Sequence, residues 1–393
     1  MLRVEALRAK KGDCLLLFHG NPDSPRINLV DGGPGGVWEE SLRPRLTRLR
    51  DERPNERLSI GLLMVSHVDD DHINGLIQLT ETLKRQQGIE DLFLDVEVLW
   101  HNSFDDLFGE AGSTLAAPGS GDVTQSSVDN IAEDLGLSEG SALALLSVGQ
   151  GRTLRDNAAA LAWTVNSPFD GLVQAGTSKS VVRMPGGMAI TVLGPDEGRL
   201  REFQEKWDIE IKKQRDKLKT AAYLDDSVYN LASIVVLIEI EGRKLLFTGD
   251  ARGDDMIKGA AKADLLDVNN QLRLDLLKVP HHGSDRNVEV DFFKTFPADH
   301  YVISGDGSHG NPALDTFRML FEARGDDPRP FTIYLTYDPA DFKAHRKTRN
   351  QPATAYPVTE LRRIWADQKA AGQDFEVIVP GPADPSVSIE FES

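Results

Sequence analysis

Short hydrophobic runs alternate with amphipathic stretches over the first hundred residues of the chain. Runs of four to eight mostly apolar residues, bounded by turn residues, are typical of buried strands. They predict strands near residues 2–8, 13–18, 26–31, 60–66 and 94–100, with polar helices around 39–50 and 73–87. This alternation of strands and helices predicts an α/β protein.

The second half of the chain shows the same kind of pattern. Two apolar runs, 234–240 and 244–247, flank Glu241-Gly242 and predict a β-hairpin. Further strands are expected at 189–193, 274–279, 331–335 and 375–379, with a helix near 357–370. We expect the elements after residue 330 to complete a second sheet.

Residues 103–175 interrupt this pattern. The stretch 103–127 is rich in Gly, Ser and Ala and predicts a long loop. Helices are expected at 129–135, at 138–146 with Ser138 as cap, and at 155–164, before an extended stretch at 176–184. We interpret 103–175 as an insertion that acts as a lid, a specificity element or an oligomer contact, with a surface decoration as the alternative.

Two imidazoles and three carboxylates lie within six consecutive residues, His67-Val68-Asp69-Asp70-Asp71-His72, directly after a predicted strand. Side chains at the carboxyl end of a strand are directed by loops, and functional residues concentrate there. Nitrogen and carboxylate ligands at this density suit Zn²⁺ or Mn²⁺. The alternative is an acidic turn in which Asp71 caps the following helix.

Other strand ends also carry polar residues. The predicted strand 274–279 runs into His281-His282, and the hairpin finishes on Asp250, whose carboxylate could bridge two cations. The strand near 26–31 leads into Asp31-Gly32-Gly33, where glycine lets the backbone turn sharply and approach a ligand. Metal ligands from several strand ends are therefore expected to meet at one edge of the fold.

Composition narrows the function classes. The 393 residues, 40% of them hydrophobic, can bury a large core. A total of 44 Lys and Arg against 62 Asp and Glu gives a net charge of −18, which counts against a DNA-coating protein. It does not exclude a nuclease, because bound metal ions reverse the local sign of an acidic cleft.

The single cysteine, Cys14, excludes an internal disulfide and thiolate metal sites, which fits a reducing cytosol. The amino terminus lacks a signal-peptide core, and no stretch is long and apolar enough to span a bilayer. We therefore expect a cytoplasmic protein that does not engage a membrane.

One basic stretch stands out in this acidic chain: Lys212, Lys213, Arg215, Lys217 and Lys219. A helix with a solvated charged face is one interpretation. The other is a phosphate-backbone contact beside the active site, because Lys and Arg provide the salt-sensitive part of nucleic-acid affinity.

Seven short segments recur here in the order in which one protein family carries them. They are Lys11-Gly12-Asp13-Cys14, Val30-Asp31-Gly32-Gly33, Ser66 to His72, Asn230 with Ser233, Thr248-Gly249-Asp250-Ala251, Lys278 to Ser284, and Ser308-His309-Gly310-Asn311-Pro312. Together they resemble the metallo-β-lactamase-fold hydrolases, and most closely the soluble hydrolase domain of ComEC-type competence proteins and their stand-alone relatives. The resemblance implies a four-layer αββα sandwich, a single domain over 1–393 and two divalent metal ions, Zn²⁺ or Mn²⁺.

The chain departs from the wider superfamily at two places. Most members have histidine where Asp69 stands, so an oxygen-rich site and Mn²⁺ gain weight here. The superfamily's Gly-His-Thr turn is replaced by Gly194-Pro195-Asp196, so one ligand is missing. His101, the only histidine between residues 73 and 280, either substitutes for it, contacts substrate or simply stacks beside Trp100.

The resemblance also implies residue roles. His67, Asp69 and the alternative ligand His101 would face one ion. Asp71, His72 and one histidine of the pair at 281–282, with His282 favoured over His281, would face the other, and Asp250 would bridge them. The expected catalytic residues are Asp71, His281 and His309; the expected supporting or substrate-contacting residues are Asp31, Asp70, Asn230, Lys278 and Ser284. His281 would then orient His282 or touch substrate, and His309 would bind a phosphate or protonate a leaving oxygen unless it is a plain loop residue.

The function implied first is hydrolysis of phosphodiesters, by a nuclease or a nucleotide phosphodiesterase that uses metal-activated water. One alternative is hydrolysis of a small ester, lactone, thioester or choline-phosphate-type compound, because the fold hosts many reactions. Another is a metal-bearing or degenerate interaction subunit of a larger assembly. A nucleic acid or nucleotide is thus the expected substrate, and a homo-oligomer or a partner protein stays open.

Overall fold

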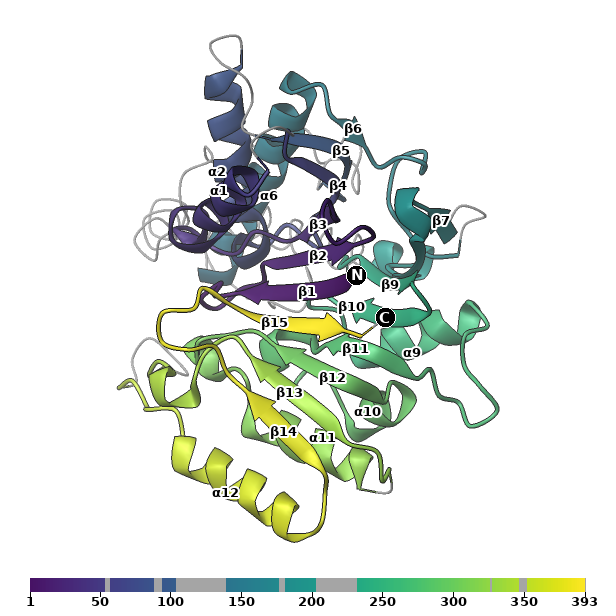
Figure 1. Cartoon of the computed structure of the whole chain (residues 1–393), viewed down its shortest axis with the longest axis vertical. Helices are drawn as coiled ribbons and strands as arrows, with labels where there is room; N and C mark the ends of the chain where they lie inside the picture. Colours follow the sequence, from purple (N-terminus) through teal and green to yellow (C-terminus); the bar gives the residue numbers. More distant parts are fainter. Residues whose placement is uncertain are drawn as a thin grey trace, which may run out of the picture.

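Two mixed β-sheets face each other between outer layers of helices (Figure 1). The computed structural model describes residues 1–53, 57–87, 94–103, 139–176, 181–202, 232–325, 327–345 and 352–392. The architecture is a four-layer αββα sandwich, so the predicted fold class is confirmed.

The first sheet has the order β15-β1-β2-β3-β4-β5-β6. Its strands are β1 (Leu2–Leu7), β2 (Leu15–His19), β3 (Arg26–Val30), β4 (Ser59–Met64), β5 (Asp95–Trp100), β6 (Thr164–Val165) and β15 (Ser386–Phe391). Strands β1 to β3 are antiparallel, and β3 to β6 are parallel. The carboxyl-terminal strand β15 was not predicted; it joins this sheet by pairing with β1.

The second sheet has the order β14-β13-β12-β11-β10-β9-β8-β7. Its strands are β7 (Val181–Arg183), β8 (Ala189–Gly194), β9 (Val235–Ile240), β10 (Arg243–Phe247), β11 (Leu274–Lys278), β12 (Ala298–Ile303), β13 (Phe331–Leu335) and β14 (Phe375–Ile378). The hairpin β9–β10 is confirmed, and so is the prediction that the elements after residue 330 complete this sheet. Strands β10 to β14 are parallel.

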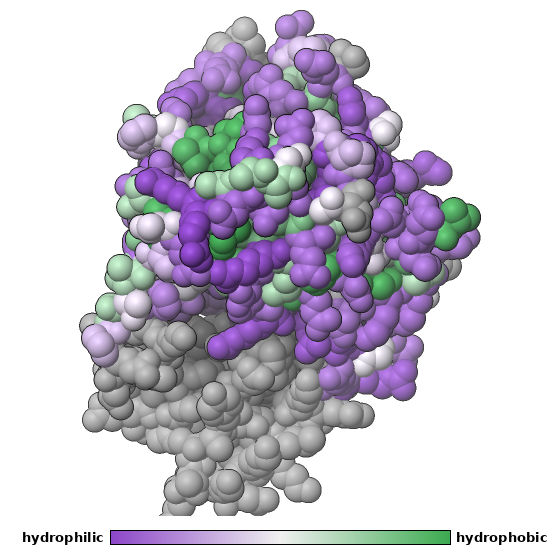
Figure 2. Space-filling view, turned by 90° about the horizontal axis from the view of Figure 1, so that it is seen from below, coloured by the Kyte–Doolittle hydropathy of each residue, from purple (hydrophilic) through white to green (hydrophobic). Residues whose placement is uncertain are grey.

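Helices cover the outer side of each sheet (Figure 1). The first sheet carries α1 (Arg43–Asp51), α2 (Asp70–Gln86) and α6 (Glu139–Ala160), and the second carries α9 (Gly253–Lys262), α10 (Val290–Thr295), α11 (Leu314–Arg324) and α12 (Val358–Ala370). The coloured part of the face seen from below, at the α12 end, is mostly hydrophilic (Figure 2). None of the helices in the described ranges is long and apolar enough to cross a membrane.

Three hydrophobic layers hold the sandwich together, one between the sheets and one under each set of helices. Strand β2 shows why the sequences of the strands are continuous apolar runs. Its residues alternate between the two neighbouring layers, with Leu16 and Phe18 toward the helices and Leu15 and Leu17 toward the second sheet. A strand covered on both faces has no polar side.

The region interpreted as an insertion differs from prediction where it is described. Residues 139–160 form the single helix α6, so the expected pair of helices at 138–146 and 155–164 is wrong. The sequence predicted a break in the helix because glycine disfavours helix interiors. Gly151 nevertheless lies inside α6, where the helix packs closely: a Cβ there would come within 3.2 Å of Val68. The expected loop 103–127 and helix 129–135 fall almost wholly outside the described residues, and a lid stays a prediction.

Helix α2 starts close to the loop that follows β3. A Cβ on Gly75 would lie 2.0 Å from the carbonyl oxygen of Gly32, and the Gly75 N–H donates to the Gly33 carbonyl. The Gly32 N–H in turn donates to the carbonyl of His72 at 2.7 Å. These glycines therefore set the distance between the Asp31 loop and the first turns of α2.

Substituting Gly75 by alanine is expected to destabilise the fold. The added methyl would overlap backbone that cannot move as a side chain does, so Gly75→Ala should lower the free energy of unfolding by about 1–3 kcal/mol. Urea unfolding followed by tryptophan fluorescence measures this change. Gly198→Ala is the control, because its Cβ would meet only the Asp196 side chain; equal stability of Gly75→Ala and wild type would contradict the close approach.

Candidate metal centre

The site lies where the carboxyl ends of strands from both sheets meet. Asp31 follows β3, His67 and His72 follow β4, Asp250 follows β10, and the pair at 281–282 follows β11. Parallel pairing of β3 with β4, and of β10 with β11, places the carboxyl ends of each pair at the same edge. Segments far apart in sequence, from residue 31 to residue 282, thus contribute to one cluster.

Four imidazole nitrogens surround the buried carboxylate of Asp250. His72 Nε2 lies 3.3 Å from its Oδ1. His67 Nε2 and His282 Nε2 lie 3.8 Å and 3.7 Å from its Oδ2. His281 Nε2 lies 3.5 Å from the same oxygen. The structure therefore brings the predicted bridging carboxylate and all four of these histidines within reach of one another.

Hydrogen bonds behind the rings decide which nitrogen of His72 and His67 faces the centre. His72 Nδ1 donates to Asp31 Oδ2 at 2.9 Å. The Ser66 hydroxyl donates to that same oxygen at 2.7 Å, so it accepts from His67 Nδ1, 3.1 Å away. Both rings consequently carry their proton on Nδ1 and turn the lone pair of Nε2 toward Asp250.

His282 is held in the same way from the other sheet. Its Nδ1 lies 3.2 Å from Asp13 Oδ1 and 3.1 Å from the Ser304 hydroxyl, which itself donates to Asp13. Lys278 Nζ pairs with the second oxygen of Asp13 at 2.8 Å. A carboxylate behind a metal-binding imidazole fixes its tautomer and raises its basicity.

Asp13 was missed as a site residue, although it lies in one of the segments that carry the resemblance. The signal was Lys278, a cation at the buried end of an apolar strand, which needs a carboxylate partner because an unpaired charge is costly to bury. The structure puts both residues at 1% exposure. Lys278, expected as a supporting residue, is thus placed behind the centre and away from its open side.

The inward-facing atoms fit a metal. Nε2 of His67, His72 and His282 and Oδ1 of Asp250 are buried, and none has a hydrogen-bond partner among the described residues. Leaving such an atom unsatisfied costs about 1–3 kcal/mol. Sets of three ligand atoms lie within 4.8 Å of one another: His67-His72-Asp250, Asp71-His72-His282, Asp13-Asp250-His282 and Asp13-Asp31-His72. The overlapping sets could hold one or two ions.

The charges of the cluster are strongly coupled. Burial alone would raise the pKa of Asp250, but His281, His72 and His282 hold it well below its usual range. Burial would lower the pKa of His72, yet Asp250 and Asp31 raise it well above the ordinary value. For Asp71, Lys11 and the imidazoles outweigh burial and lower the pKa to about 2. Without a metal, protons take the place of the cation.

The three consecutive aspartates have different surroundings. Asp69 Oδ2 lies 3.4 Å from His67 Nε2, and Asp71 Oδ2 lies 3.8 Å from His282 Nε2. Asp70 is buried and accepts hydrogen bonds from Asn74 and Gln150, both at 2.9 Å, so it links α2 to α6. Burial raises its pKa despite Lys11.

The capping alternative for Asp71 is not what the structure shows. Helix α2 begins at Asp70, which puts Asp69 in the N-cap position, and no side chain makes a capping hydrogen bond there. Asp71 lies inside the first turn, with its carboxylate toward the centre.

The remaining expected site residues lie around the cluster. His101 is buried near α6, its ring nitrogen 3.8 Å from where a Gly151 Cβ would be, and no candidate ligand set among the described residues includes it. The Ser284 hydroxyl accepts from the Arg286 N–H at 3.3 Å. His309 is exposed; crowding by protein atoms and the charge of Lys11 lower its pKa although Asp71 opposes them. Asn230 lies outside the described residues.

The backbone at the centre is unusual. His281 and His282 both have positive φ, 48° and 54°, a conformation that is rare for residues with a side chain. Gly249 has φ 50°, and a Cβ there would lie 2.7 Å from Ser66 Cβ. Such local strain persists where the surrounding structure holds it, and it is concentrated at functional sites.

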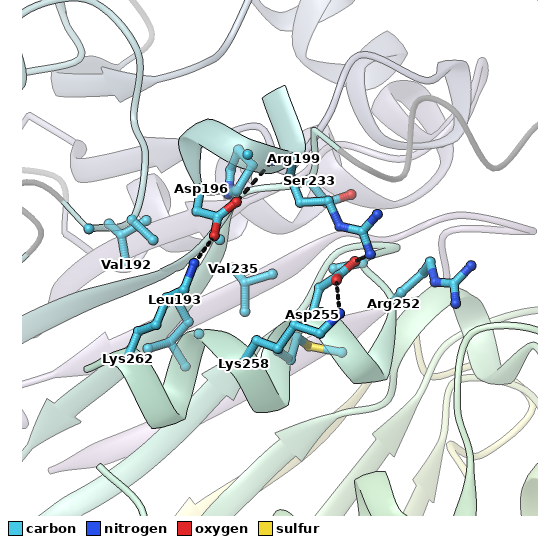
Figure 3. A pocket seen from close by; sticks show the side chains of 18 of the residues that line it. Val192, Leu193, Asp196, Arg199, Ser233, Val235, Arg252, Asp255, Lys258 and Lys262 are labelled. Carbon is cyan, nitrogen blue, oxygen red and sulfur yellow. Dashed lines mark hydrogen bonds and ion pairs between the residues drawn. The ribbon is translucent and has the colours of Figure 1, made fainter. Parts of the chain in front are cut away.

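A separate pocket of about 320 Å³ opens beside α9 (Figure 3). The pocket has an apolar wall formed by Val192, Leu193 and Val235. Two ion pairs also lie along it, one between Arg199 and Asp255 and one between Lys262 and Asp196. No candidate metal-ligand set in the described part of the chain uses a residue of this wall.

No protein-family model matches the chain, and no curated protein matches it. The class of protein is therefore inferred from its fold and its site. Two mixed sheets between helical layers, with a buried His/Asp cluster at their edge, are consistent with an αββα metallo-hydrolase-like fold.

The first prediction for the centre concerns metal-linked stability. The protein is first treated with a chelator, and Zn²⁺ or Mn²⁺ is then added to a free concentration of about 100 times the Kd of the metal. This addition should raise the free energy of unfolding by about 2.7 kcal/mol. His72→Gln should remove most of this increase, because His72 belongs to three of the ligand sets. His300→Gln, in the first half of β12, is the matched control and should keep it. An equal increase in both variants would contradict the assignment.

The second prediction for the centre concerns the release of protons when a metal binds. Asp250 and Asp31 raise the pKa of His72 despite its burial, so a metal that binds its Nε2 has to compete with a proton for that nitrogen. Metal affinity should therefore fall as the pH is lowered from 8 to 6, values chosen to bracket the ordinary histidine pKa of about 6.5. Calorimetric titrations in two buffers of different ionisation enthalpy count the released protons. Identical apparent enthalpies in both buffers would show that no proton is displaced.

Proposed function

We propose that this protein is a metal-dependent hydrolase of the metallo-β-lactamase type that cleaves phosphodiester bonds, as a nuclease or a nucleotide phosphodiesterase. The observation that carries the proposal is the convergence of His67, His72 and His282 Nε2 on Asp250, with each ring's Nδ1 held from behind. This arrangement supports a cation site, because buried acceptors that face one another need protons or a cation between them.

The roles follow from the ligand sets. His67, His72, Asp71, His282 and Asp250 would hold one or two divalent ions. When bound, such ions polarise a phosphoryl oxygen and generate a hydroxide nucleophile from water at neutral pH. No side chain then has to act as nucleophile.

The surroundings of Asp71 support an anionic substrate. Lys11 is close enough to lower the pKa of Asp71, and it acts on the exposed His309 as well. A cation and an imidazole beside the centre suit the charge of a phosphodiester. Because the net charge of the chain is −18, attraction for an anion has to come from such local groups and from bound cations.

The test is hydrolysis of single- and double-stranded DNA, RNA and a bis-aryl phosphodiester by metal-free protein with Zn²⁺ or Mn²⁺ added. Wild type should cleave at least one of them. Asp250→Asn should lower the rate more than about 100-fold, beyond the usual effect of residues behind the ligands. His300→Gln should retain the wild-type rate.

Two outcomes would overturn parts of this proposal. Turnover of carboxylic esters or lactones, with all phosphodiesters left intact, would keep the hydrolase and replace the substrate class. Bound metal in wild type with no turnover of either class would contradict the hydrolase and leave an interaction subunit.

A further inference from the structure

His281 differs from the other histidines of the centre in its exposure. Its side chain is 26% exposed, whereas those of His67, His72 and His282 are at 1%, 0% and 4%. It is therefore the one imidazole among these four that both faces Asp250 and reaches solvent. A histidine in that place can contact a substrate or a water at the centre if its acceptor nitrogen points toward Asp250.

The orientation of the Asn287 side chain follows from its neighbours. Its Nδ2 donates to the backbone carbonyl of Asp250 at 2.9 Å. A carbonyl oxygen only accepts, so the amide nitrogen must be on this side and the amide oxygen on the other. That oxygen lies 2.8 Å from His281 Nδ1.

An amide oxygen also only accepts, so His281 Nδ1 must carry a proton. In the neutral ring, Nε2 is then the acceptor nitrogen, and it lies 3.5 Å from Asp250 Oδ2. Two acceptors at this distance call for a proton, a water or a cation between them. Asn287 thus determines the chemical character of the nitrogen that His281 presents to the centre.

Asn287 is itself held in place by burial and by a backbone hydrogen bond. It is 9% exposed, and its carbonyl accepts from the N–H of Gly253 at the start of α9. The backbone of His281 is fixed separately: its N–H donates to the Gly249 carbonyl, and its own carbonyl accepts from the Asn311 side chain. The backbone and the ring of His281 are therefore held by different residues, and a change at 287 acts on the ring and on the hydrogen bond to the Asp250 carbonyl.

We propose that Asn287 is a positioning residue that locks His281 in the Nδ1–H tautomer and so directs an acceptor nitrogen at the open side of the metal centre. Its effect on the rate rests on the proposed function; its effect on the tautomer does not. A sequence motif does not reveal this residue, because Asn287 lies five residues beyond the histidine pair in a loop.

The tautomer is tested by NMR on the metal-free full chain labelled with ¹⁵N-histidine. Two-bond ¹H–¹⁵N correlations should show His281, assigned with a His281→Gln variant, as the Nδ1–H form. Asn287→Ala should shift it toward the Nε2–H form, and Asn287→Asp, which retains an acceptor, should keep it. Asn269→Asp, at an exposed turn, is the control for an added charge.

Kinetics on the metal-loaded full chain give the second readout, with the bis-aryl phosphodiester as substrate. Asn287→Ala should lower kcat about 10–100-fold while KM and metal content stay at wild-type values. Asn287→Asp should lose less, and Asn269→Asp nothing. An Nε2–H form of His281 in wild type, or an alanine variant with wild-type tautomer and kcat, would overturn the inference. An inactive wild type with the expected tautomer would instead contradict the proposed function alone.

Discussion

The structure of the centre depends on one buried carboxylate. Asp250 is 2% exposed and is surrounded by four imidazole nitrogens at 3.3–3.8 Å. Hydrogen bonds from behind commit Nδ1 of each ring to a partner, so the inward-facing nitrogens are acceptors, as the carboxylate oxygens are. A cluster of acceptors in a dry interior is stable only with protons or cations among them. The arrangement therefore explains both the displaced pKa values and the fit to divalent ions.

Residues behind the centre also join the two sheets. Asp13 precedes β2 in the first sheet, and Lys278 ends β11 in the second; their ion pair at 2.8 Å is fully buried. Breaking such a pair is typically worth 3–5 kcal/mol, because the remaining charge is left uncompensated. The same carboxylate orients His282. Assembly of the sandwich and orientation of a ligand are thus achieved by one interaction.

Close backbone approaches bring the contributing loops together. Gly12 lies so near the Asp71 carbonyl that a Cβ would be 1.9 Å from it, and a Cβ on Gly249 would be 2.7 Å from Ser66 Cβ. The left-handed backbone at His281 and His282 turns both rings to the same carboxylate. These features show why the motif residues are interspersed with glycine: the candidate metal ligands converge only if the loops that carry them nearly touch.

The hydrophobic pattern by itself determined most strands and the α/β class, because burial between layers imposes apolar runs of strand length, whereas the αββα layering was implied only by the resemblance that the motif residues carry. It also determined the ligand types, since His67, His72, Asp250 and His282 all follow such runs. It failed where local propensity was overridden, as at α6, which contains glycines that let it pack against Val68. Only the tertiary structure decided that Asp70 faces α6 while Asp71 faces the centre, that Asp13 lies behind His282, and that Asn287 holds His281. Those facts rest on contacts between segments distant in sequence or on the direction of a side chain in a turn, and neither leaves a periodic trace in the chain.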